Sequence, residues 1–160
     1  MSLGAFLAVA VPVLAAFATA VLVYYLQARR QDEREDAQRE IEWRETWMKV
    51  RAEIARNRNV RLRLHERLAG IGPLPRDAHE QLRADAWDEE SGRLSQLMPP
   101  EDFERLETYY REREQFAEAL RDYHRPEHTK TDRPRLRHNL RRLSEGVADA
   151  ERRVLGNRGG

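Results

Sequence analysis

Hydrophobic residues are distributed along this chain in two different ways. Residues 3–26 contain no charged side chain, whereas the rest of the chain is rich in charge and carries its apolar residues at regular intervals. About 20 consecutive apolar residues form a helix long enough to cross the roughly 30 Å hydrocarbon core of a membrane. We therefore predict that residues 1–30 are a transmembrane anchor.

Two other interpretations of this run are a cleaved signal peptide and a buried soluble helix. Ala18, Thr19 and Ala20 have the small-x-small pattern of a cleavage site. However, no Lys or Arg precedes the run, and it continues through Tyr24 and Tyr25, which suit a membrane interface. The remaining chain is too short to surround a wholly apolar helix of this length. These features favour an uncleaved anchor.

The flanking charges predict the orientation of this anchor. Arg29, Arg30, Arg34 and Arg39 follow the run, and no basic side chain precedes it. Basic residues next to a span stay on the cytoplasmic side. We expect a single-pass protein of the cell (inner) membrane, with its C-terminal domain in the cytoplasm.

Small residues recur every four positions within the run, at Gly4, Ala8, Pro12, Ala16 and Ala20. This spacing lets two helices approach closely in lipid. The alternative is that alanine is simply common in such helices. The stripe is the first of two reasons to expect a homo-oligomer.

A charged stalk and a long amphipathic helix are predicted over residues 31–70. Residues 27–40 have almost no apolar face, as in a helix surrounded by solvent. An inward row with alternating steps of four and three residues then begins: Trp43, Trp47, Val50, Ile54, Asn57, Arg61, Leu64 and Leu68. A second row, at Ile41, Met48, Ala55 and Leu62, widens this stripe, which is the second reason to expect self-association.

The remaining bundle helices are predicted within residues 77–156. Gly70 suits a left-handed residue after a helix, and a capping box at Asp77 and Glu80 predicts the next helix start. That helix should weaken near Gly92, leaving Leu94, Leu97 and Met98 as a short connection. A third helix should start near Pro100, and the last carries an inward row at Leu136, Leu140, Leu143, Val147, Ala150 and Val154.

The fold class predicted from these patterns is all-α. One transmembrane helix continues into a charged stalk and then into a small up-and-down bundle.

The layout resembles that of small single-pass membrane-anchored prokaryotic helical proteins of unknown function. The residues that carry the resemblance span residues 41 to about 123 and are Glu53, Ile54, Asn57, Ala86, Trp87, Leu97, Pro99, Pro100, Tyr109 and Tyr110. Asp88, Glu89 and Glu90 depart from the apolar residues expected after the Trp. The resemblance implies architecture only, because the family supplies no activity.

Composition and motifs indicate no enzyme. The chain has no Cys and a net charge of +1, which exclude a thiolate site and a generally nucleic-acid-coating protein. His124 and His128 have metal-like spacing, but Pro126 separates them and no third ligand completes a site. We expect no catalytic, cofactor-binding or metal-binding residues, and no cofactor.

One basic tract is a candidate contact for anionic lipid or nucleic acid: Arg133, Arg135, Arg137, Arg141 and Arg142. The alternative is an exposed basic helix face. No aromatic residue lies among these arginines, which disfavours a nucleic-acid partner.

The function hypothesis is a membrane-anchored scaffold or regulatory protein that acts through protein contacts. Its expected partners are the lipid bilayer, an unidentified protein and further copies of itself. Trp43, Trp47 and Ile54 should provide packing, and Asn57 should either fix helix register or face a water-filled gap. The alternative is a lysis component resembling phage inner-membrane spanins, with the helical domain in the periplasm.

Overall fold

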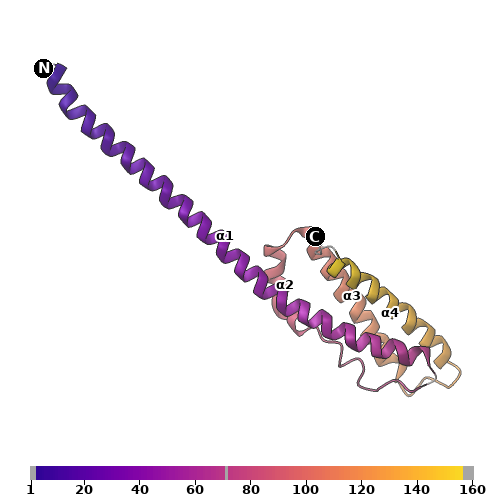
Figure 1. Cartoon of the computed structure of the whole chain (residues 1–160). Coiled ribbons are helices and arrows are strands. Elements are labelled where there is room, and N and C mark those ends of the chain that lie inside the picture. The colour runs from indigo at the N-terminus through magenta and orange to yellow at the C-terminus, as the bar shows by residue number, and fades with distance from the viewer. Residues whose placement is uncertain (1–2, 71, 157–160) are drawn as a thin grey trace. The chain divides into compact units, whose positions relative to one another are not determined.

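The computed structural model describes residues 3–70 and 72–156, with side-chain surroundings from residue 17 onward. Four helices are present: α1 (Leu3–Ala69), α2 (Asp85–Leu97), α3 (Pro100–Tyr123) and α4 (Arg133–Gly156), with no strand in the described ranges (Figure 1). The prediction of an all-α helical bundle is confirmed at this level. The chain divides into two compact units, Met1–Glu42 and Trp43–Gly160.

The described residues of the first unit, 3–42, all belong to α1. Every side chain described between residues 17 and 42 is exposed. Local pairs such as Arg29–Glu33, with 3.1 Å between Nε and Oε1, stabilise the helix surface. Among the residues described with their side chains, no helix is long and apolar enough to cross a membrane. The predicted span covers residues 3–26, and the side chains of residues 3–16, with most of the small-residue stripe, lie outside that set.

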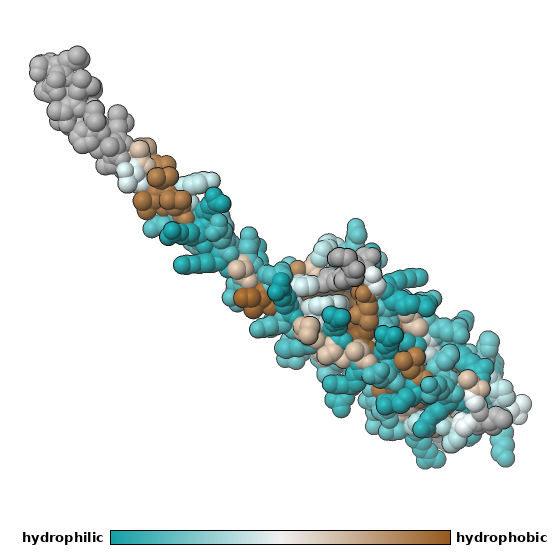
Figure 2. All heavy atoms as spheres, viewed as in Figure 1, coloured by the Kyte–Doolittle hydropathy of each residue, from teal (hydrophilic) through white to brown (hydrophobic). Residues whose placement is uncertain are grey.

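The second unit is a helical bundle with one hydrophobic core. Helices α3 and α4 lie side by side, and α1 contributes its residues from Trp43 onward (Figure 1). Most residues of the predicted inward rows are buried, including Val50, Ile54, Leu68, Leu140 and Val147, whereas Leu136 and Leu143 are half-buried. Hydrophilic residues predominate on the face of this bundle seen in Figure 2. The 3.6-residue period of the sequence therefore identified the core correctly.

The predicted width of the α1 stripe is wrong. The first row is buried as far as Leu68, and Trp43 is half-buried at its start. The second row is exposed: Ile41 is 52%, Met48 60% and Leu62 44% accessible to solvent. Only a narrow stripe of α1 contacts α3 and α4, so the second row faces away from the bundle.

Residues 72–84, which precede α2, contain turns where the sequence predicted a helix from Asp77. The backbone N–H groups of Ala78, Glu80 and Leu82 bond to carbonyls three residues earlier. Leu74, Ala78 and Leu82 are buried, so the segment is anchored by a row of apolar side chains. The capping-box prediction is wrong because both backbone groups of the following Arg83 bond to a side chain of α1, which interrupts a helical ladder there.

Helix ends differ from prediction at two further places. Helix α1 ends at Ala69 as expected, but no glycine among the described residues has a positive φ, so Gly70 is not a left-handed cap. Helix α2 continues through Gly92, and Leu94 and Leu97 belong to it rather than to a connection. Pro100 begins α3, where its missing N–H is harmless, as predicted.

Replacing Leu140 with Asp tests the core. Leu140 is 1% exposed, so Leu140→Asp places an unpaired charge among apolar side chains, and such burial costs several kcal/mol against a typical total of about 5–15. We expect loss of helical circular dichroism or a much lower melting temperature. Glu145→Asp puts the same residue type at an exposed position of α4 and should melt like the original protein. Equal melting of the two variants would contradict the core assignment.

Candidate functional site: a polar network inside the bundle

Glu53 of α1 joins two other helices from inside the bundle. Its side chain is 4% exposed. One carboxylate oxygen accepts a hydrogen bond from the Tyr110 hydroxyl at 2.7 Å, and the other accepts one from the Ala86 backbone N–H at 2.9 Å. Ala86 lies in the first turn of α2, where N–H groups lack partners within the helix and a negative charge is favourable. A residue of α1 thereby provides the cap that α2 lacks in its own sequence.

Asn57 lies one turn further along α1 and holds the backbone just before α2. Its Nδ2 donates to the Arg83 carbonyl at 2.7 Å, and its Oδ1 accepts from the Arg83 N–H at 2.9 Å. Arg113 of α3 donates to the neighbouring Leu82 carbonyl at 3.1 Å. Asn57 is 2% exposed, so it lies in protein contacts rather than facing the water-filled gap that the sequence analysis allowed.

Aromatic rings cover this network. Trp87 stacks on Tyr110 with ring centroids 4.6 Å apart and on Phe103 at 5.5 Å, and Tyr109 meets Tyr110 edge-on. Burial raises the pKa of the Tyr110 hydroxyl, and its hydrogen bond to Glu53 raises that pKa further. Burial also raises the pKa of Tyr109. Both phenols therefore stay protonated, and Tyr110 acts as a permanent hydrogen-bond donor.

Two buried carboxylates form ion pairs around the network. Glu151 of α4 pairs with two arginines of α1: its Oε2 lies 3.2 Å from Nη2 of Arg61, and its Oε1 lies 3.3 Å from Nε of Arg58. Glu90 of α2 contacts Lys49 of α1, whose pKa rises because of that hydrogen bond. This contact between Lys49 and Glu90 joins α1 to α2.

The predicted packing residues meet in this region of the structure. Trp47, Ile54 and Asn57 are buried, and the rings of Trp43 and Trp47 stack with centroids 6.4 Å apart. Among the residues that carry the family resemblance, Glu53 accepts hydrogen bonds from Tyr110 and Ala86, and Trp87 stacks on Tyr110. The resemblance itself stays a prediction.

Other members of the network were missed by sequence reasoning, although their positions gave a signal. Glu151 falls between Val147 and Val154 on the inward side of α4, and Arg113 lies seven residues after Leu106 on that of α3. Together with Arg61, they are charges in otherwise apolar rows. Such positions require partners of opposite charge or backbone acceptors, which the opposing rows supply.

The basic tract of α4 is divided between two roles. Arg137 donates to the carbonyls of Arg67, Gly70 and Gly72 at 2.7, 2.9 and 3.1 Å, and Arg141 donates to the Leu68 carbonyl. The carbonyls of Arg67 and Leu68 lie in the last turn of α1, where helix acceptors lack partners, and those of Gly70 and Gly72 follow it. Arg137 and Arg141 therefore cap α1, while Arg133, Arg135 and Arg142 stay exposed.

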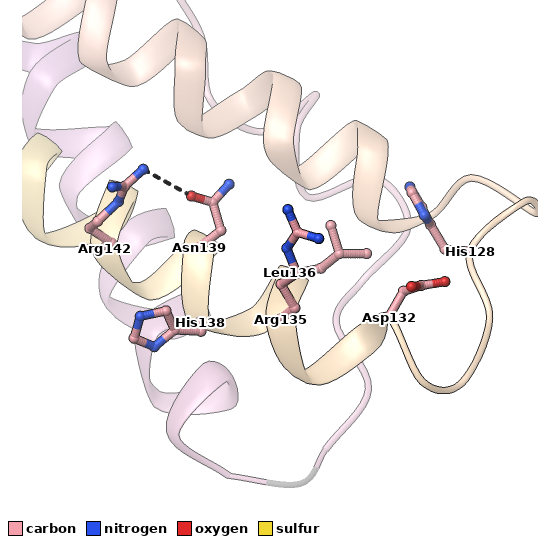
Figure 3. Close-up of a pocket in the computed structure, with 7 residues that line it drawn as sticks. All are labelled: His128, Asp132, Arg135, Leu136, His138, Asn139 and Arg142. Atoms are coloured by element: carbon pink, nitrogen blue, oxygen red, sulfur yellow. Dashed lines mark hydrogen bonds between the residues drawn. The ribbon is translucent and has the colours of Figure 1, made fainter.

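An open groove of about 560 Å³ lies beside the start of α4 (Figure 3). Its lining side chains are His128, Asp132, Arg135, Leu136, His138, Asn139 and Arg142. Hydrogen bonds from the Thr129 hydroxyl and N–H to Asp132 lower the pKa of that carboxyl. In residues 3–70 and 72–156 no three His, Asp or Glu side chains are placed to hold a metal ion.

Comparisons with protein-family models, with curated proteins and with solved structures find no match for this chain. Its buried polar groups hold helices and a connecting segment in place.

Glu53 and Tyr110 can be tested by a double-mutant cycle. Glu53→Ala leaves the Tyr110 hydroxyl and the Ala86 N–H unpaired, and each such buried group costs about 1–3 kcal/mol. We expect Tyr110→Phe to be less damaging after Glu53→Ala, with a coupling energy of about 0.5–3 kcal/mol in urea unfolding. Tyr123→Phe, remote from Glu53, should add to Glu53→Ala without coupling. Additive effects for Glu53 and Tyr110 would contradict their interaction.

The bundle should lose stability as pH falls from 7.5 to 5.5. His124 donates to the Pro75 carbonyl at 2.9 Å, and burial lowers the pKa of its ring from 6.5. A depressed pKa means that the folded state resists protonation, so stability present above about pH 6.5 falls as pH drops towards the folded pKa. His124→Gln should make the melting temperature less dependent on pH in this window. His138→Gln, at an exposed site, should leave the dependence unchanged; if both variants keep it, His124 is not its source.

Proposed function

We propose that this protein is a single-pass membrane protein whose folded unit, Trp43–Gly160, acts by binding other proteins. The orientation proposed is the one that the arginines after the span favour, with the bundle in the cytoplasm. The observation that carries the proposal is the contrast between an uncharged run over residues 3–26 and a bundle whose inward polar groups are used for packing.

Exposed apolar side chains at the end of the run support the anchor. Phe17, Leu22 and Tyr24 are 68%, 58% and 75% exposed, and every other side chain described between residues 17 and 42 is exposed too. A continuous exposed apolar surface of this kind is unfavourable in water and favourable in lipid. The arginines and acids of the stalk begin directly after it.

The interior of the bundle supports binding rather than catalysis. Glu53 and Asn57 bond to backbone groups and to Tyr110, and Glu151 is held between two arginines. The raised pKa of Tyr110 keeps its hydroxyl protonated near neutral pH, so it does not release its proton to act as an acid or a base. Groups held in this way position helices, and the surface they support is left to contact partners.

Of the two reasons to expect self-association, only the one in the proposed membrane-spanning residues still applies. The inward row of α1, from Trp47 to Leu68, is covered by the chain's own helices, so it is not available to pair two copies. The small-residue stripe from Gly4 to Ala20 still has the spacing that brings helices together in lipid.

The rival function, a spanin-like lysis component, has a similar layout with the opposite topology. It shares the N-terminal span and the long charged helix, but its helical domain would lie in the periplasm. Topology therefore separates the two functions.

Membrane extraction with a reporter at Gly160 tests the proposal. We expect the full chain to stay with membranes under a carbonate wash and a C-terminal reporter to be active in the cytoplasm. Leu14→Arg with Ala15→Arg should release the protein, because each arginine at the centre of a span costs about 2.5–3.5 kcal/mol on insertion scales.

Gln31→Arg with Gln38→Arg adds the same charge to the exposed helix and should leave the protein in the membrane. A soluble original protein, or one cut after Ala20, would overturn the anchor. A periplasmic reporter would favour the lysis function.

A further inference from the structure

The outer face of α1 in the bundle, defined by Met48, Ala52, Ala55, Asn59 and Leu62, is exposed along its whole length. Met48 and Leu62 are the large apolar side chains of this row. The five positions alternate in steps of four and three, which is the spacing of a helix–helix contact rather than of a broad apolar surface. Alanine at two central positions would let a second helix come close, towards the lower end of the usual 8–10 Å separation.

Basic side chains border this row on both sides. Arg51 lies on one side, Arg56 and Arg63 lie on the other, and none of the three forms an ion pair with a described residue. Lys49 and Arg58 are also basic but already contact Glu90 and Glu151. Glu53 is the only acid between Met48 and Arg63, and it is buried. The exposed charge along this stretch is therefore entirely positive.

This combination restricts what can cover the outer face. A second copy using the same face would bring arginine against arginine, which disfavours pairing. A helix with apolar residues in its seam and acids on both sides of it would complement both features, because charges beside the seam determine which partner is chosen.

We propose that the outer face of α1 binds an acidic amphipathic helix of a partner protein. The proposal rests on the protein-binding part of the proposed function and names the chemistry of the partner. A membrane surface suits the face less well, because helices that lie in lipid use a wide face with Trp, Phe and Leu. Nucleic acid would leave the exposed Met48 and Leu62 without an apolar contact.

A designed peptide can serve as the probe. It has three heptads with Leu at the seam positions and Glu at the positions beside them, and it carries a fluorophore. Titration with the full chain in mild detergent, followed by anisotropy, should show saturable binding that weakens as salt rises. The same peptide with Lys in place of each Glu should not bind.

Matched variants distinguish binding at this face from non-specific attraction of the acidic peptide to basic residues elsewhere on the protein. Arg51→Gln, Arg56→Gln and Arg63→Gln together should weaken binding about tenfold or more, corresponding to about 1.4 kcal/mol. Arg133→Gln, Arg135→Gln and Arg142→Gln remove the same charge from α4 and should change it little. Ala55→Arg also adds positive charge, but its long side chain would keep a second helix from coming close to the outer face. It should therefore weaken binding if a helix docks there.

Three results would overturn the proposal. One is equal loss from the two triple variants, and another is tighter binding by Ala55→Arg. The third is a protein that does not bind the peptide but binds phosphatidylglycerol vesicles or duplex DNA, with binding that is weakened when Arg51, Arg56 and Arg63 are replaced. None of these results bears on the membrane anchor, which the carbonate wash tests separately.

Discussion

The side-chain amide of Asn57 bonds to both backbone groups of Arg83, and much of the bundle depends on this pair of hydrogen bonds. A buried peptide group without a partner is costly, so the segment before α2 can pass close to α1 only where its N–H and carbonyl are satisfied. Asn57 meets that requirement from α1, and Arg113 meets it from α3 for the adjacent Leu82. The same contacts end the turns of residues 76–82 and allow α2 to begin in a new direction.

Glu53 extends this arrangement by one helical turn. It caps α2 at Ala86 and accepts from Tyr110, whose ring lies against Trp87 of α2. The start of α2 is thus fixed from two sides, by a carboxylate and by a stacked ring. Because the hydrogen bonds are buried and directional, they select one arrangement of three helices, whereas apolar contacts alone tolerate several.

The sequence was informative where burial follows a period and uninformative where a polar group finds a distant partner. Val50, Ile54, Leu140 and Val147 could be placed in the core because residues three and four apart share a helix face. The start of α2 could not be found, because the bonds that interrupt the chain at Arg83 come from a residue 26 positions away.

The candidate site also contains residues that the sequence could identify and residues that it could not. Asn57 was noticeable as a polar group in an apolar row, and Glu151 could have been found by the same reasoning. The roles of Arg137 and Arg141 were hidden, because a basic tract on a helix surface looks the same whether it faces solvent or the end of another helix. The exposure of Met48 and Leu62 could not be predicted either. The sequence shows how wide an apolar stripe is, but not how much of that stripe other helices cover.

The capping of α1 by α4 has a consequence for the order in which the chain can fold. Arg137 bonds to a carbonyl 70 positions earlier, and α4 leaves the ribosome after α1, α2 and α3. Until α4 is made, the carbonyls of Arg67 and Leu68 lack the donors that Arg137 and Arg141 provide in the folded chain. All residues of α1 are therefore synthesised well before Arg137 and Arg141 can bond to the carbonyls at its C-terminal end. The bundle reaches its final form only after α4 has been synthesised.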